Sequence, residues 1–210
     1  MDQIELAYLL GAFKDGSVYK NDKEKIYRIR IYQKSKQWLQ EIAKLFQKLF
    51  TTKLYLRKDP RKEVWYLEIN KKTLFDKLSK LLSDPIPKII KKGSIKIKLS
   101  YIQGFFDAEG GILRIENYEN DETKLKKKLQ DIRVRFGQAN REVLEFVKKT
   151  LEEVGINSGK ICGPFFKTKT SKPYYEFNCY GIENLRRFSS LIGSRHPIKS
   201  IRISKINAYT

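Results

Sequence analysis

Two acidic residues, Asp15 and Glu109, each stand directly before a glycine at the end of an apolar segment. The two segments, YLLGAFKDG at residues 8–16 and YIQGFFDAEGG at residues 101–111, are predicted to be helical. Carboxylates at the negative ends of two helices repel one another if they are brought together, and a divalent cation relieves that repulsion. Mg²⁺ accepts oxygen ligands from carboxylates and phosphate, and it can activate water against a phosphodiester. These residues therefore favour metal-dependent phosphodiester hydrolysis.

A glycine lies inside each of these apolar helices, Gly11 in the first and Gly104 in the second. Glycine costs a helix interior about 1 kcal/mol relative to alanine, so its presence requires a reason. Close packing of the two helices through these glycines would supply one, and it would bring the two acids together beside a pseudo-twofold axis. For one segment taken alone, an ordinary helix end closed by glycine, with a solvated acid, is the simpler interpretation.

The elements that follow the acids belong to a sequence repeat. Residues 27–33 alternate apolar and polar side chains, which predicts a strand with one buried face, and residues 132–138 repeat the pattern. The two strands align at a constant offset of 105 (133 − 28), which matches Arg28 with Arg133, Arg30 with Arg135 and Gln33 with Gln138. Chance alternation would not also reproduce both arginines and the glutamine, so the chain contains an internal duplication.

The alternation also predicts which side chains face outward from each sheet. The outward set is Arg28, Arg30 and Tyr32 in the first copy and Arg133 and Arg135 in the second. A two-stranded ribbon fits the major groove, and arginine forms paired hydrogen bonds with guanine, so we expect these residues to contact DNA. Any one arginine could equally be a solvated side chain, and the repetition favours the DNA contact. Phosphates are expected to be held by Lys53, Lys58, Lys167 and Lys169.

The order of predicted elements gives an α+β fold. The first half has helices at about residues 3–14, 35–50 and 74–82 and strands at about residues 27–33, 53–58 and 64–69. The second half has strands at about residues 132–138, 161–166 and 174–179 and later helices at about residues 143–154 and 185–192. We predict two pseudo-symmetric αββαββα halves, residues 1–93 and 94–210, each with an antiparallel sheet.

Two further segments are assigned by their composition. Residues 87–101 hold a single glycine among lysines and isoleucines, and they are expected to tether the two halves. Residues 117–129 form a charged insert in the second copy, rich in lysine. Such an insert is either a solvated loop or a contact with phosphate.

The charge of the chain indicates a polyanionic partner. Forty-four Lys and Arg against 24 Asp and Glu give a formal net charge of +20 and a pI near 9.8. A heat-adapted surface would bring acids in similar number to form ion-pair networks, so it does not explain this excess. An anionic membrane surface is also disfavoured, because no basic amphipathic helix is apparent. The basic residues placed between aromatics along strands favour double-stranded DNA.

Cysteine and histidine are too few for a zinc site or a disulfide framework. The chain has Cys162, Cys179 and the single histidine His196, so the usual zinc spacings cannot be assembled. The cysteines are predicted to be small apolar strand residues in a reducing intracellular compartment. The apolar stretch at residues 6–13 is too short to span a bilayer and lacks a signal-peptide pattern. We expect a soluble cytoplasmic protein that joins the nucleoid when bound to DNA.

The two motifs at residues 9–16 and 102–110 resemble the paired signature of a single-chain LAGLIDADG homing endonuclease of the archaeal intron-encoded type. The resemblance covers nearly the whole chain. It implies two antiparallel sheets that form a saddle over the major groove, in a monomer with internal pseudo-twofold symmetry. It also implies site-specific double-strand cleavage at a long, largely asymmetric target, with Mg²⁺ or Mn²⁺ as the cofactor.

The resemblance also assigns roles to individual residues. It implies that Asp15 and Glu109 are the metal ligands and that Gln33 and Gln138 are the polar active-site residues after the second strand of each half. Residues 196–200 resemble the family's closing segment, in which Lys199 would be a basic residue near the site. A surface lysine is the simpler interpretation of Lys199, and His196 is expected to be a structural or phosphate-facing residue.

The first motif departs from the family pattern. Glycine and acid are five positions apart in the second motif (109 − 104) and four apart in the first (15 − 11). On a regular α-helix the missing residue would rotate Asp15 by about 100°. Either a local distortion restores its position, or the first site is weakened. A weakened site would give unequal rates of strand cleavage, and complete loss of one site would make the enzyme a nickase. The alternative function is a module that binds nucleic acid without cutting it, such as an RNA maturase or a transcription regulator.

Overall fold

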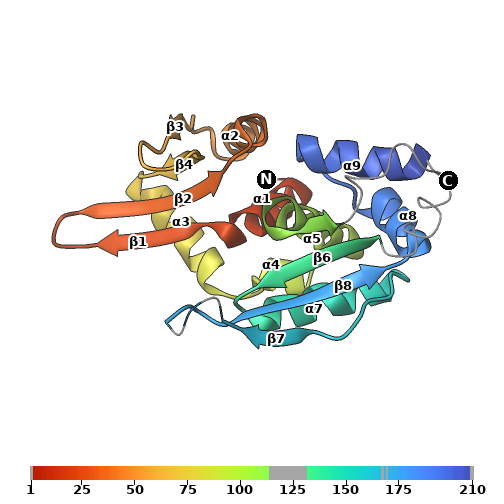
Figure 1. Ribbon diagram of the computed structural model, residues 1–210. Helices are drawn as coiled ribbons and strands as arrows, with labels where there is room; N and C mark the ends of the chain where they lie inside the picture. Colours follow the sequence, from red (N-terminus) through yellow and green to blue (C-terminus); the bar gives the residue numbers. More distant parts are fainter. Residues whose placement is uncertain (1, 114–131, 167, 169, 209–210) are drawn as a thin grey trace. The chain divides into compact units, whose positions relative to one another are not determined.

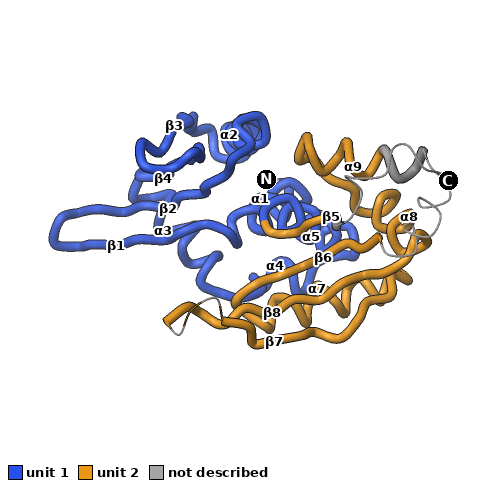
Figure 2. The backbone as a smooth tube through the Cα atoms, viewed as in Figure 1, with its two compact units in different colours: residues 1–108 blue, residues 109–210 orange. Residues whose placement is uncertain are grey.

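The computed structural model describes residues 2–113, 132–166, 168 and 170–208, with side chains up to residue 204 (Figure 1). The charged insert at residues 117–129, Lys167 and Lys169 lie outside the described residues. The chain divides into two compact units, residues 1–108 and 109–210, which are coloured separately in Figure 2. Each unit is described below by itself.

Unit 1 contains one four-stranded antiparallel sheet and five α-helices in its described part. Its elements are α1 (Gln3–Ala12), the 3₁₀ turn η1 (Phe13–Asp15), β1 (Ser17–Asn21), β2 (Ile26–Gln33), α2 (Lys36–Phe50), β3 (Leu56–Lys58), β4 (Trp65–Ile69), α3 (Lys72–Ser83), α4 (Lys88–Lys91) and α5 (Ile95–Glu109). The strands are ordered β1-β2-β4-β3. From α1 to α3 the unit follows the predicted αββαββα order.

One face of this sheet is covered by helices, as the alternation of β2 predicts. Ile29 and Ile31 are fully buried, and they pack in one core with residues of α1, α2 and α3. The apolar positions of α2 recur at helical spacing, so one stripe of the helix faces the sheet. Ser35 begins this helix as predicted, because its hydroxyl accepts a hydrogen bond from the Trp38 amide at 3.3 Å.

Helices α1 and α5 contact each other through their backbones inside unit 1. A Cβ atom on Gly11 would overlap the carbonyl oxygen of Tyr101 and would lie 2.7 Å from the amide nitrogen of Phe105. A Cβ atom on Gly104 would overlap the carbonyl oxygen of Tyr8 in the same way. The close approach inferred from the two helical glycines is therefore confirmed.

A hydrogen bond further along the same two helices supports this contact. The Ser100 hydroxyl donates to the carbonyl oxygen of Ile4 at 2.8 Å. Ser100 and Gly104 lie four residues apart on α5, so they face α1 from the same side of the helix. The contact thus extends over at least one full turn of each helix.

Unit 2 repeats the sheet of unit 1 with the same topology. Its elements are β5 (Gly111–Leu113), β6 (Arg133–Gln138), α7 (Arg141–Glu153), β7 (Cys162–Phe165), β8 (Tyr174–Tyr180), α8 (Ile182–Leu191) and α9 (Pro197–Ala208), and the strands are ordered β5-β6-β8-β7. Phe136 of β6 stacks on Phe177 of β8 with ring centroids 5.2 Å apart, and Phe188 of α8 packs against it at 6.1 Å. These rings fill the side of the sheet that α7 and α8 cover.

Several local assignments from the sequence are corrected. Residues 87–101, expected to be a tether, are largely helical, because their isoleucines form α4 and the beginning of α5. Strand β3 begins at Leu56 and is shorter than predicted, strand β1 had not been delimited, and helix α9 was not expected after Pro197. Cys179 is buried in β8 as expected, whereas Cys162 is exposed in β7.

The helices carry no membrane-spanning segment in the described part of the chain, since none combines the length and the apolar composition needed to cross a bilayer.

We predict that Gly11→Ala or Gly104→Ala destabilises the protein by at least about 1–3 kcal/mol, because the new methyl group must push α1 and α5 apart. Thermal or urea unfolding measures the effect. Gly111→Ala is the matched control, since a Cβ there would meet no atom within 4 Å. Equal stability of all three variants would contradict the backbone contact.

Candidate active site

The first motif helix ends in a turn of different geometry from the second. Helix α1 stops at Ala12, and Phe13–Asp15 form a 3₁₀ turn, whereas α5 stays α-helical to Glu109. A 3₁₀ turn rises about 2.0 Å and rotates about 120° per residue, against about 1.5 Å and 100° in an α-helix. Of the two alternatives drawn from the sequence, the local distortion is the one that the structure contains.

The 3₁₀ turn compensates for the axial rise of the missing residue and for part of its rotation. The four steps from Gly11 to Asp15 advance about 7.5 Å along the helix axis, the same as the five α-helical steps from Gly104 to Glu109. The rotations are about 460° and 500°, so about 40° of the expected 100° offset remains. On these ideal values, the tighter turn lets four residues cover the axial distance that five residues cover in α5.

Gln33, the last residue of β2, connects the ends of the two motif helices. Its amide nitrogen Nε2 donates to Asp15 Oδ2 at 3.3 Å and to the carbonyl oxygen of Ala108 at 3.1 Å. Ala108 directly precedes Glu109 in α5. All three partners lie in unit 1, so one side chain holds the carboxylate of the first motif beside the backbone of the second.

A buried hydrogen-bonded chain lies beneath this junction. The Trp38 indole N–H donates to the Tyr8 hydroxyl at 2.9 Å, and that hydroxyl donates to Asp107 Oδ2 at 2.7 Å. Each of these three side chains is at most 2% exposed. Buried polar groups are costly unless they are paired, so this chain ties α2, α1 and α5 together at one geometry.

Glu109 and Gln138, the residues predicted for the second site, both belong to unit 2. Glu109 is half-buried at the last position of α5. Gln138 ends β6, and its side-chain oxygen accepts a hydrogen bond from the Ala139 amide at 2.6 Å. The two glutamines therefore occupy equivalent strand positions but form different hydrogen bonds. Gln33 donates to Asp15 and Ala108, whereas Gln138 accepts from the backbone of the next residue.

The Tyr174 side chain belongs to the same region and was missed by the sequence reasoning. Its hydroxyl lies over Gly137, where a Cβ atom would overlap it. Burial raises the pKa of Tyr174; Arg135 opposes this shift, and the carboxylates of Glu176 and Glu109 add to it. Gly137 inside a strand was the available signal, since glycine there marks a close approach by another group.

His196 and Lys199 lie at the beginning of α9. His196 is buried, and this burial lowers its pKa to about 4, with a further contribution from Lys199. A histidine that stays neutral at physiological pH fits the structural role expected for it. Lys199 is half-buried on the first turn of α9.

The predicted DNA-contacting side chains project from the uncovered face of each sheet. Arg28 lies 5.9 Å from the ring centroid of Tyr19, and Arg133 lies 5.9 Å from that of Tyr180. Arg30 forms an ion pair with Glu68, while Arg135 lies 3.7 Å from Glu176. The alternation of apolar and polar residues along the strands therefore predicted correctly which side chains face outward. It did not predict the aromatic and acidic residues next to them.

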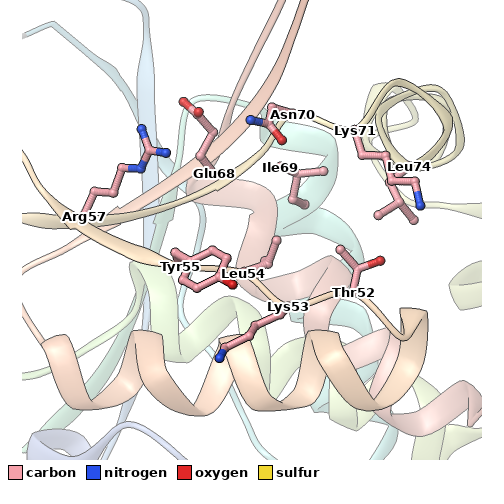
Figure 3. Close-up of a pocket in the computed structure, with 10 residues that line it drawn as sticks. All are labelled: Thr52, Lys53, Leu54, Tyr55, Arg57, Glu68, Ile69, Asn70, Lys71 and Leu74. Atoms are coloured by element: carbon pink, nitrogen blue, oxygen red, sulfur yellow. The ribbon is translucent and has the colours of Figure 1, made fainter.

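A basic cavity of about 290 Å³ opens at the edge of the first sheet (Figure 3). It forms where the chain before β3 diverges from the end of β4, and its lining includes Lys53, Tyr55, Arg57, Asn70 and Lys71. The ammonium group of Lys53 lies 5.3 Å from the ring centroid of Tyr55. This environment is compatible with the phosphate contact expected of Lys53.

The oxygen donors at the Gln33 junction fit a hard divalent cation. Asp15 is exposed, and two oxygen donors meet at this junction, the Asp15 carboxylate and the Ala108 carbonyl, both of which accept from the Gln33 amide nitrogen. Mg²⁺ prefers such oxygen ligands and usually retains positions for water and substrate phosphate. Within the described ranges, no three His, Cys, Asp or Glu side chains form a metal-binding group.

Two repeated α+β units, each preceded by an apolar helix that ends in an acid, define the class of this protein. The sequence profile of the LAGLIDADG-like domain matches residues 3–82 and 96–193, and the chain belongs to that family.

The relatives agree with this assignment. Homing endonuclease I-ApeI of Aeropyrum pernix is 26% identical over 220 residues, which cover 98% of this chain and 88% of that protein. The crystal structure of I-DmoI in complex with DNA and Ca has a TM-score of 0.68 at 22% identity and covers 98% of both chains. The N-terminal LAGLIDADG domain of DUF199/WhiA has a TM-score of 0.58 at 15% identity, covering 97% of this chain and 88% of that chain. These structures confirm the predicted α+β fold.

We predict that Tyr8→Phe lowers the free energy of unfolding by about 1–3 kcal/mol, because the buried Asp107 carboxylate and Trp38 N–H both lose a partner. Denaturant unfolding measures this loss. Tyr19→Phe is the control, since Tyr19 is 51% exposed. A Tyr8→Phe protein as stable as the control would show that the buried chain contributes nothing.

We predict that His196 makes the protein less stable in acid. Because the pKa of His196 falls from 6.5 to about 4 on folding, the unfolded chain binds the proton more readily. The stability that the neutral histidine contributes is complete above pH 6.5 and is lost as the pH falls towards 4. The difference in Tm between wild type and His196→Gln should therefore shrink as the pH is lowered through this range. A difference that is independent of pH would contradict the buried neutral histidine.

Proposed function

We propose that this chain is a site-specific, divalent-metal-dependent DNA endonuclease that cuts both strands of its target. The observation that supports this most strongly is the hydrogen bonding of Gln33, which reaches Asp15 of the first motif and the backbone next to Glu109 of the second. Similarity to I-ApeI, which is named a homing endonuclease, points to the same activity.

Each site residue has a defined task in this proposal. The carboxylates of Asp15 and Glu109 would hold Mg²⁺ or Mn²⁺, and Gln33 keeps the Asp15 carboxylate in place. A cation held there would supply the positive charge that lowers the pKa of bound water and stabilises the leaving oxygen of the phosphodiester. Gln138 orients water at the second site, and Lys199 supplies a positive charge near the scissile phosphate. The buried Asp107–Tyr8–Trp38 chain holds the ends of the motif helices rigid.

DNA recognition is assigned to the uncovered faces of the two sheets, which would form a saddle in the major groove of a duplex bound by one monomer. Arg28, Arg30 and Tyr32 project from the first sheet, and Arg133 and Arg135 from the second. The formal net charge of +20 supplies long-range attraction to the phosphate backbone.

Supercoiled plasmids that carry sequences flanking the gene, or duplexes selected from a randomised library, test the proposal directly. Linear product that requires Mg²⁺ or Mn²⁺ supports double-strand cleavage. Nicked product alone would indicate that only one site is active. Retarded DNA without any cleavage would support the alternative, a nucleic-acid-binding module such as a maturase or a transcription regulator.

We predict that Glu109→Gln and Asp15→Asn each reduce double-strand cleavage by at least about 10²-fold, because each removes a charge that holds the cation. Duplex binding should change by less than about tenfold, since neither acid contributes to the basic surface. Gel retardation and plasmid cleavage measure the two effects. Glu41→Gln, on the exposed side of α2, is the control for loss of one negative charge. Wild-type cleavage by Glu109→Gln would remove Glu109 from the mechanism.

A further inference from the structure

Arg30 is held in one orientation by three neighbours on the first sheet. Its Nε–H donates to Glu68 Oε2, and its Nη1 donates to the Tyr32 hydroxyl at 3.2 Å. The ring of Tyr66 lies beneath the guanidinium group, with its centroid 4.9 Å from Cζ. The register of the sheet explains this cluster, because Arg30 pairs with Glu68 across β2 and β4, and Tyr32 pairs with Tyr66.

Burial determines which partner a ligand can reach. The Glu68 side chain is 11% exposed and that of Arg30 is 27% exposed. The carboxylate therefore supports the guanidinium group from within the sheet surface, and Arg30 remains the accessible partner. Figure 3 shows Glu68 and Arg57 projecting to the same side of their strands, at the rim of the basic cavity.

The guanidinium group retains the donors needed to recognise a base. Arginine has five N–H donors, and the hydrogen bonds to Glu68 and Tyr32 occupy two of them. The remaining donors lie on Nη1 and Nη2, at the end of the side chain. An arginine fork of this kind matches O6 and N7 of guanine in the major groove. Partial burial acts to lower the pKa of Arg30, and the two hydrogen bonds outweigh it, so the side chain remains charged.

The equivalent arginine of the second sheet has much weaker support. Arg135 pairs across the strands with Asn178, where the first sheet has a glutamate. Its Nη1 atom forms an ion pair with Glu176 Oε2 at 3.7 Å. This distance is longer than that of a hydrogen bond. Gly137 occupies the position that corresponds to Tyr32. The hydroxyl group of Tyr174 lies over this glycine, and the charge of Arg135 acts to lower the pKa of Tyr174, so a tyrosine from another strand takes this place in the second sheet.

We propose that Glu68 is a positioning residue that fixes Arg30 for recognition of one guanine, so that the first sheet reads its base pair strictly and Arg135 reads the corresponding base pair loosely. This inference rests on the proposed function, since it requires a duplex on the uncovered face of the sheet. It assigns a role to an acidic residue on a surface that should otherwise avoid acids.

The negative charge of Glu68 is the strongest argument that this residue serves the choice of base rather than the overall affinity for DNA. A carboxylate next to the DNA-binding face weakens attraction to phosphates, so a surface built only for affinity would exclude it. A pre-oriented arginine avoids the entropy loss of ordering a long side chain when the base is bound. Glu68 therefore lowers non-specific affinity and raises discrimination between bases. These two effects have opposite signs, which separates them from a general loss of structure.

The experiment measures the base preference in binding at every position of a duplex that the wild-type protein selects. Binding is measured in Ca²⁺, so that the result does not depend on cleavage. Arg30→Lys first identifies the base pair that Arg30 reads, as the position at which the guanine preference is lost. Glu68→Gln should lower the guanine preference at that position by about 3- to 10-fold. It should also raise affinity for unrelated duplexes by about 2- to 5-fold.

Two further variants serve as controls. Glu68→Asp keeps the charge but shortens the side chain, so it should lower the guanine preference without raising non-specific affinity. Glu176→Gln in the second sheet should leave the Arg30 position unchanged. Thermal melting checks that each variant is folded. If Glu68→Gln does not fold, the guanine preference of Glu68→Asp tests the positioning role instead.

The outcomes separate the inference from the proposed function. An unchanged guanine preference in a folded Glu68 variant would overturn the positioning role, as would an equal loss of preference at all positions. A guanine preference that Glu176→Gln weakens as much as Glu68→Gln does would also overturn it. If the wild-type protein selected no duplex at all, the DNA-binding function itself would fail.

Discussion

Backbone contact between α1 and α5 is the constraint on which the candidate site depends. Gly11 and Gly104 leave no room for a side chain between the helices, so the helix ends are held at one separation. Any Cβ at either position would overlap a carbonyl oxygen of the other helix. The hydrogen bonds of Gln33 and the buried chain from Trp38 to Asp107 then act on helix ends that are already close together. Packing of the two glycines brings the helix ends close together, and the polar contacts orient the side chains at those ends.

The two sheets show how one scaffold carries different surface chemistry. Their strand orders are equivalent, and their buried faces are filled by similar apolar side chains. Their uncovered faces differ, because Arg30 pairs across the strands with a glutamate that accepts its hydrogen bond, while Arg135 pairs with an asparagine and lies 3.7 Å from Glu176. Duplication followed by divergence of the exposed positions accounts for two sheets of equal topology with different surface chemistry. The buried positions could not diverge as far without loss of packing.

Much of the fold followed from periodicity in the sequence. The repeat of Arg28, Arg30 and Gln33 at a constant offset predicted two equivalent sheets, and the helical glycines predicted the α1–α5 contact. Partners across strands could not be predicted, because the pairing of Arg30 with Glu68 depends on the register between segments 38 residues apart. Helix α4 and the start of α5 were missed because their isoleucines and lysines were taken for a connection. The placement of the Tyr174 hydroxyl over Gly137 depends on the direction of that side chain, which the sequence does not specify.

The 3₁₀ turn at the end of α1 has a consequence for how such proteins are recognised in genomes. Axial height, rather than residue count, is what the turn preserves, because fewer residues cover the same distance when the helix tightens. A search pattern with a fixed interval between glycine and acid would reject the first motif of this chain, although its tighter turn covers the same axial distance on ideal values. A pattern that tolerates a difference of one residue in this spacing would accept both motifs of the chain.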